Sequence, residues 1–127
     1  MLKYLGIDWG EKRIGLASGD SETCLALPFK TVANLTDLLR VIDEEDVDEL
    51  VLGVPFKMSR PEDSLNSDFS YFYEKLASKS HLLIHQMDER LSSLGADALI
   101  GNKKTKAGRD EIAAALILQT YLDRLAR

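Results

Sequence analysis

The sequence has little cysteine and no long apolar run. Its 127 residues include one cysteine, Cys24, which cannot form an internal disulfide and excludes thiolate-based zinc and iron–sulfur sites. No apolar run approaches the roughly 18–20 residues that span a bilayer, and the N-terminus has neither a long apolar stretch nor a small-residue cleavage site. We therefore expect a cytoplasmic protein without a membrane partner, in which Cys24 is a small buried side chain.

Positive charge is scarce overall and is unevenly distributed. The net charge of −5 argues against a protein that coats nucleic acid, but it allows an enzyme with one local basic edge. Residues 36–50 carry a local charge of −6 with Arg40 as their only base, whereas residues 101–109 hold bases and no acid. The acids of the first segment are Asp37, Asp43, Glu44, Glu45, Asp46, Asp48 and Glu49. The bases of the second segment are Lys103, Lys104, Lys106 and Arg109.

The hydrophobic pattern predicts an α/β fold. Apolar alternation and short apolar runs predict strands over 2–8, 13–18, 23–29, 49–55 and 81–87. Helical spacing predicts helices over 36–45, over about 69–77, near 90–100 and over 112–122. Thr36 is the expected N-cap of the first helix, and Pro28 predicts a sheet edge or a strand end. This order predicts one domain over 1–127, with a mixed five-stranded sheet (an antiparallel three-strand meander plus two parallel strands) and helices on both faces.

Carboxylates fall at three structural boundaries of this arrangement. Asp8 ends the first strand, the pair Asp88–Glu89 ends the last strand, and the pair Asp110–Glu111 opens the last helix. Because chemistry gathers at strand ends and helix N-termini in open α/β sheets, all three sites could converge on one rim. Converging carboxylates are typical of Mg²⁺ or Mn²⁺ sites. Each acid also has a plain structural interpretation, as a turn former or a helix cap, and spacing alone does not choose within either pair.

Four segments together resemble one protein family. They are GIDWGEKRIGLA at 6–17, LVLGVP at 50–55, DERLSS at 88–93 and DEIAAALIL at 110–118. In this order they resemble the YqgF family, small bacterial proteins described as pre-16S rRNA nucleases and earlier as Holliday junction resolvases. The resemblance implies an RNase H-like fold. The chain departs from the family after Pro55, where FKMSRPEDS replaces the usual asparagine and glycine, and this affects substrate grip more than the metal site.

The resemblance also implies a catalytic set and a reaction. Asp8, Glu89 and Asp110 match the family's catalytic carboxylates, and they would hold two Mg²⁺ or Mn²⁺ ions. The implied activity is metal-dependent endonucleolytic hydrolysis of phosphodiester bonds, in maturation of the 5′ end of pre-16S rRNA. The implied partners are structured RNA or branched DNA and a pre-ribosomal particle, with the chain acting as a monomer or weak dimer.

Several basic residues are candidates for phosphate contacts. Arg13 and Lys12 belong to the predicted hairpin turn beside Asp8, and Arg90 follows Glu89. The basic segment adds four more candidates, namely Lys103, Lys104, Lys106 and Arg109. Each of these side chains could instead be a solvated surface charge, which for Lys12 is the better interpretation.

Other functions and residues have to be weighed beside this hypothesis. The same chemistry could act on branched DNA, because no motif here recognises the 2′-hydroxyl of RNA. An actin-like or sugar-kinase-like ATPase also opens with D-x-G, but it binds ATP between two such lobes, and 127 residues make one. A non-catalytic binding module is a third alternative. We expect His81 and His85 to be structural, and Trp9 to be either a stacking platform for a base or an aromatic wedge that shapes the turn.

Overall fold

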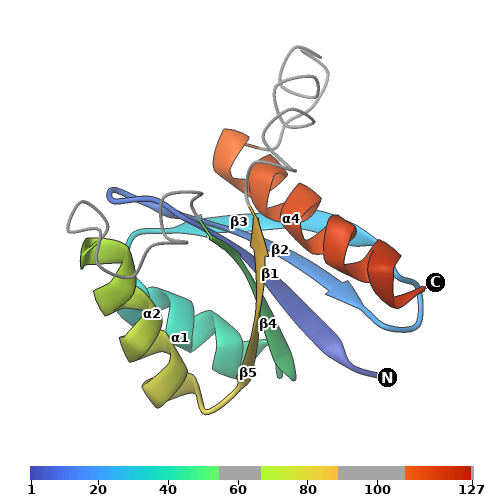
Figure 1. The fold of residues 1–127 in the computed structure, drawn as a ribbon, viewed down its shortest axis with the longest axis horizontal. Helices are drawn as coiled ribbons and strands as arrows, with labels where there is room; N and C mark the ends of the chain where they lie inside the picture. The colour runs from blue at the N-terminus through green and yellow to red at the C-terminus, as the bar shows by residue number, and fades with distance from the viewer. Residues whose placement is uncertain (55–66, 89–107, 127) are drawn as a thin grey trace.

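The computed structural model describes residues 1–54, 67–88 and 108–126 (Figure 1). Within these ranges the chain forms strands β1 (Lys3–Trp9), β2 (Ile14–Asp20), β3 (Ala26–Val32), β4 (Glu49–Val54) and β5 (Leu83–Asp88). The helices are α1 (Leu35–Glu44), α2 (Ser67–Ser80) and α4 (Arg109–Leu125). The predicted helix near 90–100 lies outside the described residues. No helix in the described ranges is long and apolar enough to cross a membrane.

The five strands form one mixed sheet in the order β3-β2-β1-β4-β5. The pairs β1–β2 and β2–β3 are antiparallel, whereas β1–β4 and β4–β5 are parallel. This confirms the predicted combination of a three-strand meander with two parallel strands. Pro28 lies in β3 at the sheet edge, as its sequence position predicted, beside a register shift between Leu16 and Ala17 of β2.

Helices cover both faces of the sheet (Figure 1). Side chains of a strand alternate between faces, and β1 follows this rule. Leu5 and Ile7 belong to a core with residues of α1 and α2, whereas Tyr4 packs with residues of α4 on the other side. The alternation places Gly6 and Asp8 on the α4 face too. The sheet therefore separates two hydrophobic cores, and Asp8 shares its face with α4.

The helix boundaries differ from the prediction at the start of α1. Asn34, not Thr36, is the N-cap, and its side-chain oxygen accepts a hydrogen bond of 2.9 Å from the backbone N–H of Asp37. The helix begins at Leu35 because asparagine satisfies the first free N–H groups two residues earlier. Leu38 and Ile42 are buried against the sheet as the apolar spacing predicted, and Val41 is buried beside them.

The strand boundaries also differ from the prediction, and two of the differences concern residues that were given a role. Antiparallel pairing continues to Trp9 opposite Ile14, so Asp8 lies inside β1 rather than at its end. The third strand begins at Ala26 rather than at residue 23. Cys24 lies in the preceding turn with a φ of 55° and is half-buried, so the expectation of a buried side chain is wrong.

Glycines on the α4 face allow this helix to approach the sheet closely. A β-carbon on Gly6 would lie 2.7 Å from the Cβ of Leu118, and one on Gly19 would lie 3.2 Å from the Cδ2 of Leu118. The contact is tightest at Gly15, where a β-carbon would lie 2.2 Å from the carbonyl oxygen of Asp110. The first turn of α4 therefore rests directly on the backbone of β2.

We expect Gly15→Ala to lower the free energy of unfolding by about 1–3 kcal/mol, because the added methyl must push the start of α4 away from β2. Gly108→Ala is the matched control at the same helix end. A β-carbon there would meet no atom closer than 3.5 Å, and alanine at this N-cap should cost about 0.5–1 kcal/mol. Urea denaturation measures both variants. A loss at Gly15 no larger than the loss at Gly108 would contradict the close contact.

Candidate functional site

The candidate site lies where β1, β2 and the start of α4 meet. Asp8 pairs with Gly15 across the β1–β2 ladder, and it is half-buried. Directly opposite residues of an antiparallel pair have Cα atoms about 4.5–5.5 Å apart. Because Gly15 is in contact with the backbone of Asp110, the two aspartates lie on either side of a single glycine. The predicted convergence of Asp8 with the start of the last helix is therefore present.

Asp110 is engaged by an arginine from the hairpin between β1 and β2. The Nε of Arg13 lies 2.7 Å from Oδ2 of Asp110, and the two side chains are 69% and 31% exposed. Arg13 was predicted as a phosphate contact, and its pairing with Asp110 was not foreseen from the sequence. The pair depends on the tertiary packing of α4 on β2, and its only sequence signal is the glycine two residues after Arg13.

The neighbouring acid, Glu111, has a different role. Its Oε1 accepts a hydrogen bond of 3.2 Å from the backbone N–H of Gly108, the N-cap of α4. Gly108 has no side chain with which to cap the helix, so the third helical residue supplies this contact. Of the two acids that open α4, Glu111 therefore serves the helix and Asp110 faces β2.

The third carboxylate site is only partly described. Asp88 is the last residue of β5 and pairs with Val54 of β4. Met87 is buried in the core beneath α4, so strand alternation assigns Asp88 to the opposite face, away from Asp8 and Asp110. Glu89 lies outside the described residues.

The predicted basic residues are distributed differently. Lys12 is exposed in the hairpin turn next to Arg13, and Arg109 is exposed as the first residue of α4. The remaining candidates lie outside the described residues, and they are Arg90, Lys103, Lys104 and Lys106. Of the seven candidate bases, Lys12, Arg13 and Arg109 lie in the described residues, and Arg13 contacts an aspartate of the site.

The donor set at this site fits a hard divalent cation. Carboxylate oxygens are the ligands that Mg²⁺ and Mn²⁺ prefer, and two aspartates on rigid, adjoining elements supply them. Across the described ranges, no three His, Cys, Asp or Glu side chains are grouped closely enough to form a metal site by themselves. Asp8 and Asp110 therefore form two sides of a possible site.

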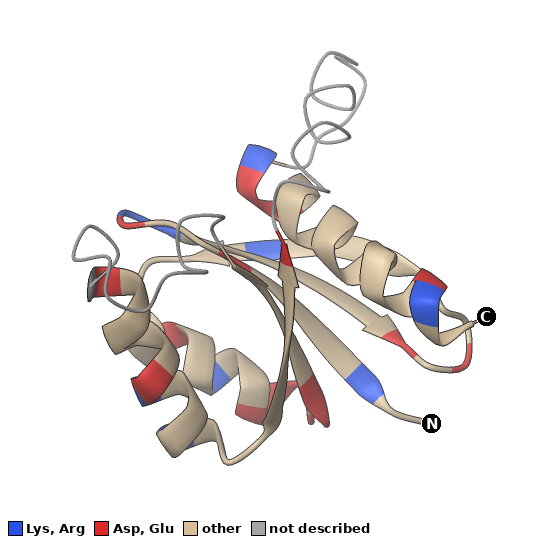
Figure 2. Ribbon diagram, in the orientation of Figure 1, with Lys and Arg blue, Asp and Glu red and all other residues tan. Residues whose placement is uncertain are grey.

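Acidic residues gather away from this site. Figure 2 shows acidic positions along α1 and α2, on the face of the sheet opposite α4. Two acids that follow α1 have structural partners. Glu45 lies 3.2 Å from the Nζ of Lys3, and Asp48 accepts a hydrogen bond of 2.8 Å from the backbone N–H of Lys3. The predicted −6 segment is thus a surface remote from Asp8 and Asp110.

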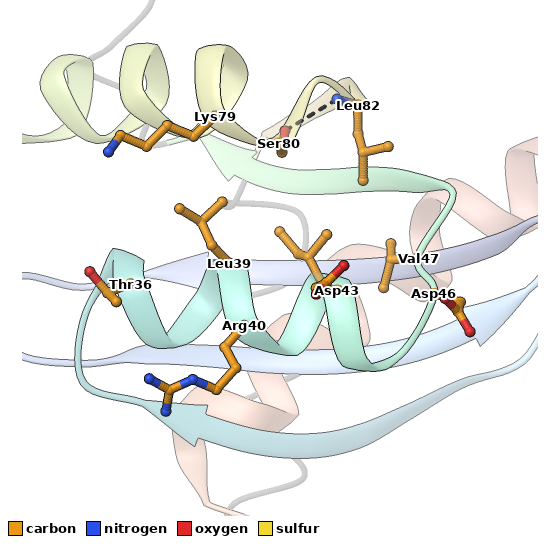
Figure 3. A pocket seen from close by; sticks show the side chains of 10 residues that line it. Thr36, Leu39, Arg40, Asp43, Asp46, Val47, Lys79, Ser80 and Leu82 are labelled. Atoms are coloured by element: carbon orange, nitrogen blue, oxygen red, sulfur yellow. Dashed lines mark hydrogen bonds between the residues drawn. The ribbon is translucent and has the colours of Figure 1, made fainter.

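A cavity of about 570 Å³ lies between α1 and the end of α2 (Figure 3). Leu39 and Val47 contribute apolar walls, and Arg40, Asp43 and Lys79 contribute charges of both signs. The cavity is on the α1–α2 side of the sheet, so it takes no part in the aspartate site.

Trp9 packs against α2. Its ring lies 5.6 Å from that of Phe69 at 81° and 6.0 Å from that of Phe72, centroid to centroid. Both phenylalanines are buried, as their helical spacing predicted, and Tyr73 packs against the same core. The structure thus favours the structural interpretation of Trp9 over a stacking platform.

A second polar cluster lies at the opposite end of the α4 face. The Nε2 of His85 lies 2.5 Å from Oε1 of Glu49, and the ring of His85 stacks on Tyr121 at 4.5 Å. His85 is therefore structural, as predicted. His81, by contrast, is exposed in the link before β5 with a φ of 58° and not in a strand.

Burial, with a smaller contribution from the charge of Glu49, raises the pKa of Tyr4 and of Tyr121.

Comparison with known proteins connects this geometry to a family. Residues 2–124 match the family model described as "RuvX: Holliday junction resolvase". A protein of Endomicrobium trichonymphae is 36% identical, over 97% of this chain and 96% of its own length. A protein of Maridesulfovibrio salexigens is 34% identical, over 97% of this chain and 99% of its own. Both bear the name "Putative pre-16S rRNA nuclease".

A solved structure supports the fold. RuvC of T. thermophilus, in complex with a Holliday junction substrate, superposes with a TM-score of 0.65 over 98% of this chain and 96% of its own. At 13% identity this likeness concerns the fold alone. The RNase H-like fold expected from the sequence motifs is confirmed.

The raised pKa values of the two tyrosines predict a loss of stability in alkali. Because their folded-state pKa values exceed the ordinary value of 10.0, both contribute stability that is fully present below about pH 10 and is lost as the pH rises through the folded values. Tyr121→Phe should make this decline shallower, by at most about 1.4 kcal/mol per pH unit. Urea denaturation between pH 8 and pH 11 measures the slope.

The control for this experiment is Tyr71→Phe, because Tyr71 is 64% exposed. It should leave the alkaline decline unchanged. An identical slope in wild type and Tyr121→Phe would show that ionisation of Tyr121 is not linked to folding.

Proposed function

This chain belongs to the RuvX (YqgF) family, and from that premise we propose that it is a metal-dependent endonuclease that matures the 5′ end of pre-16S rRNA in the cytoplasm. Membership of the family makes it a nuclease, an enzyme that hydrolyses nucleic acid. Our proposal adds that the reaction depends on a metal, that the cut is made within the strand and that the substrate is RNA. We also propose that residues 1–127 form a single RNase H-like domain that acts as a monomer or weak dimer.

The observation that carries this proposal is the meeting of Asp8 and Asp110 at Gly15. Asp8 is fixed by pairing on β1, and Asp110 is fixed by the contact of α4 with β2. Two carboxylates on rigid elements can bind a cation without first paying the entropy of ordering a loop. The placement of both residues on one face matches the roles that the family resemblance assigns to them.

We propose that Glu89 completes the set. Asp88, its neighbour, belongs to the opposite face of β5 by strand alternation, because Met87 is buried beneath α4. The family resemblance assigns the role to Glu89, and the face of Asp88 disfavours Asp88 as the partner of Asp8 and Asp110. The three carboxylates would hold two Mg²⁺ or Mn²⁺ ions.

The metal, when bound, supplies Lewis-acid activation of water and charge neutralisation at the scissile phosphate. The protein residues bind and orient the nucleic acid around it. Lys12, Arg13 and Arg109 are exposed around the aspartates and can bind backbone phosphates. Arg90 and the basic segment Lys103–Lys104–Lys106 extend the proposed contact surface. The acidic surface on α1 faces the other way and disfavours binding of a second stretch of nucleic acid there.

Precursor rRNA is favoured over branched DNA by the names of the full-length relatives. The alternative, a Holliday junction resolvase, is favoured by the description of the family model. A pre-ribosomal particle would then be the partner that presents the RNA. The two substrates share the phosphodiester chemistry, so a direct comparison must separate them.

We expect the protein to cut an RNA fragment that spans the 5′ end of 16S rRNA, in Mg²⁺ or Mn²⁺, and to leave a four-way DNA junction intact. The products should carry 5′-phosphate and 3′-hydroxyl ends, because water rather than the 2′-hydroxyl is the nucleophile. Asp8→Asn and Asp110→Asn should each lower the cleavage rate at least about a hundredfold, more than the loss of an outer partner of a metal ligand. Gel electrophoresis of end-labelled substrates measures the rates.

Asp43→Asn is the matched control, since it removes the same charge from the exposed surface of α1, and it should cut at the wild-type rate. Cleavage of the junction alone would move the resolvase to first place. RNA cleavage that persists at the wild-type rate in Asp8→Asn would contradict the catalytic role of Asp8. Absence of cleavage with tight RNA binding would favour the non-catalytic binding module.

A further inference from the structure

The ion pair between Arg13 and Asp110 occupies one of the two aspartates of the proposed site. The contact is short, with Nε of Arg13 2.7 Å from Oδ2 of Asp110. It joins elements far apart in the sequence, the hairpin turn between β1 and β2 and the first turn of α4. The guanidinium takes up lone pairs of Oδ2 that a metal ion bound at that oxygen would need, and Oδ1 stays open to a metal.

A guanidinium and a divalent cation cannot share one carboxylate oxygen without strong repulsion. At a separation of about 4 Å their like charges oppose each other by roughly 2 kcal/mol in water and by more beside a protein surface. Arg13 is therefore a competitor for the ligand position of Asp110. Its side chain is 69% exposed, so it can leave Asp110 without disturbing the core.

We propose that Arg13 is a built-in counter-ion of Asp110, which competes with a divalent cation for this carboxylate and so lowers the metal affinity of the site. This inference rests on the proposed function, because it takes Asp110 as a ligand. In the metal-free protein the guanidinium neutralises Asp110 and limits its repulsion with Asp8. Once displaced, Arg13 faces solvent beside the site, where it can bind a substrate phosphate. Arg13 thus acts through Asp110 and tunes the affinity of the site for the metal.

The expected size of the effect follows from the exposure of the pair. Partly exposed ion pairs shift an equilibrium by a factor of a few. When a competitor occupies a ligand position part of the time, the apparent metal affinity is the intrinsic affinity multiplied by the fraction of time for which the position is free. Removal of Arg13 should therefore raise the affinity for Mn²⁺ about three- to sixfold.

Lys12 provides the matched control. It is the adjacent residue of the same turn, is exposed, and carries the same charge. Lys12→Gln thus removes one positive charge near the site while it keeps the pair between Arg13 and Asp110. Because an exposed charge is largely screened at physiological salt, Lys12→Gln should raise the Mn²⁺ affinity less than about twofold.

The experiment is a titration of metal-free protein with MnCl₂ at pH 7.5, with free Mn²⁺ followed by electron paramagnetic resonance. It compares wild type, Arg13→Gln, Lys12→Gln and Asp110→Asn, each checked for folding by circular dichroism. We expect Arg13→Gln to bind Mn²⁺ about three- to sixfold more tightly than wild type, Lys12→Gln to bind within about twofold of wild type, and Asp110→Asn to bind much more weakly.

The outcomes separate this inference from the proposed function. If Asp110→Asn weakens Mn²⁺ binding but Arg13→Gln binds no more tightly than Lys12→Gln, the counter-ion role is wrong and the metal site stands. If Asp110→Asn binds Mn²⁺ as wild type does, Asp110 is not a ligand, and both the counter-ion role and the proposed metal site are overturned.

Discussion

The contact between Gly15 and the backbone of Asp110 is the constraint on which the candidate site depends. Only a residue without a side chain allows α4 to rest on β2 at this point. The contact brings the first turn of α4 to β2, the strand that pairs with β1, so that Asp110 packs on the residue directly opposite Asp8. The rest of α4, which buries Leu118 and Leu122 against Gly6 and Gly19, holds this contact in place.

The sheet divides the molecule electrostatically as well as hydrophobically. Exposed bases occupy the hairpin turn and the start of α4, and one of them, Arg13, contacts Asp110. On the other side, α1 and the loop after it carry most of the excess negative charge. A chain of net charge −5 can therefore still present one face to nucleic acid. The pair between Arg13 and Asp110 is a local example, in which an exposed base neutralises a carboxylate of the candidate site.

Local patterns predicted the architecture well, because each strand and helix buries a regular set of apolar side chains. They misplaced Asp8, since the pairing of Trp9 with Ile14 extends the hairpin beyond the last apolar residue of the pattern. They also predicted Thr36 rather than Asn34 as the N-cap of α1. Both residue types can cap a helix, and the turn before the helix determines which of them does so. The preference for Asp110 over Glu111 came from the family resemblance. In the structure, Glu111 is engaged with Gly108 and Asp110 with Arg13. The pairing of Arg13 was beyond any local pattern, because it depends on tertiary packing.

The central claim is that Asp8 and Asp110 share one divalent cation. Crystals grown with MnCl₂, measured at the manganese absorption edge, test it most directly. The account predicts an anomalous difference peak within about 2.0–2.3 Å of a carboxylate oxygen of each aspartate, and its disappearance in Asp8→Asn crystals. A peak on the acidic surface of α1 alone, with both aspartates ordered and unoccupied, would contradict the claim.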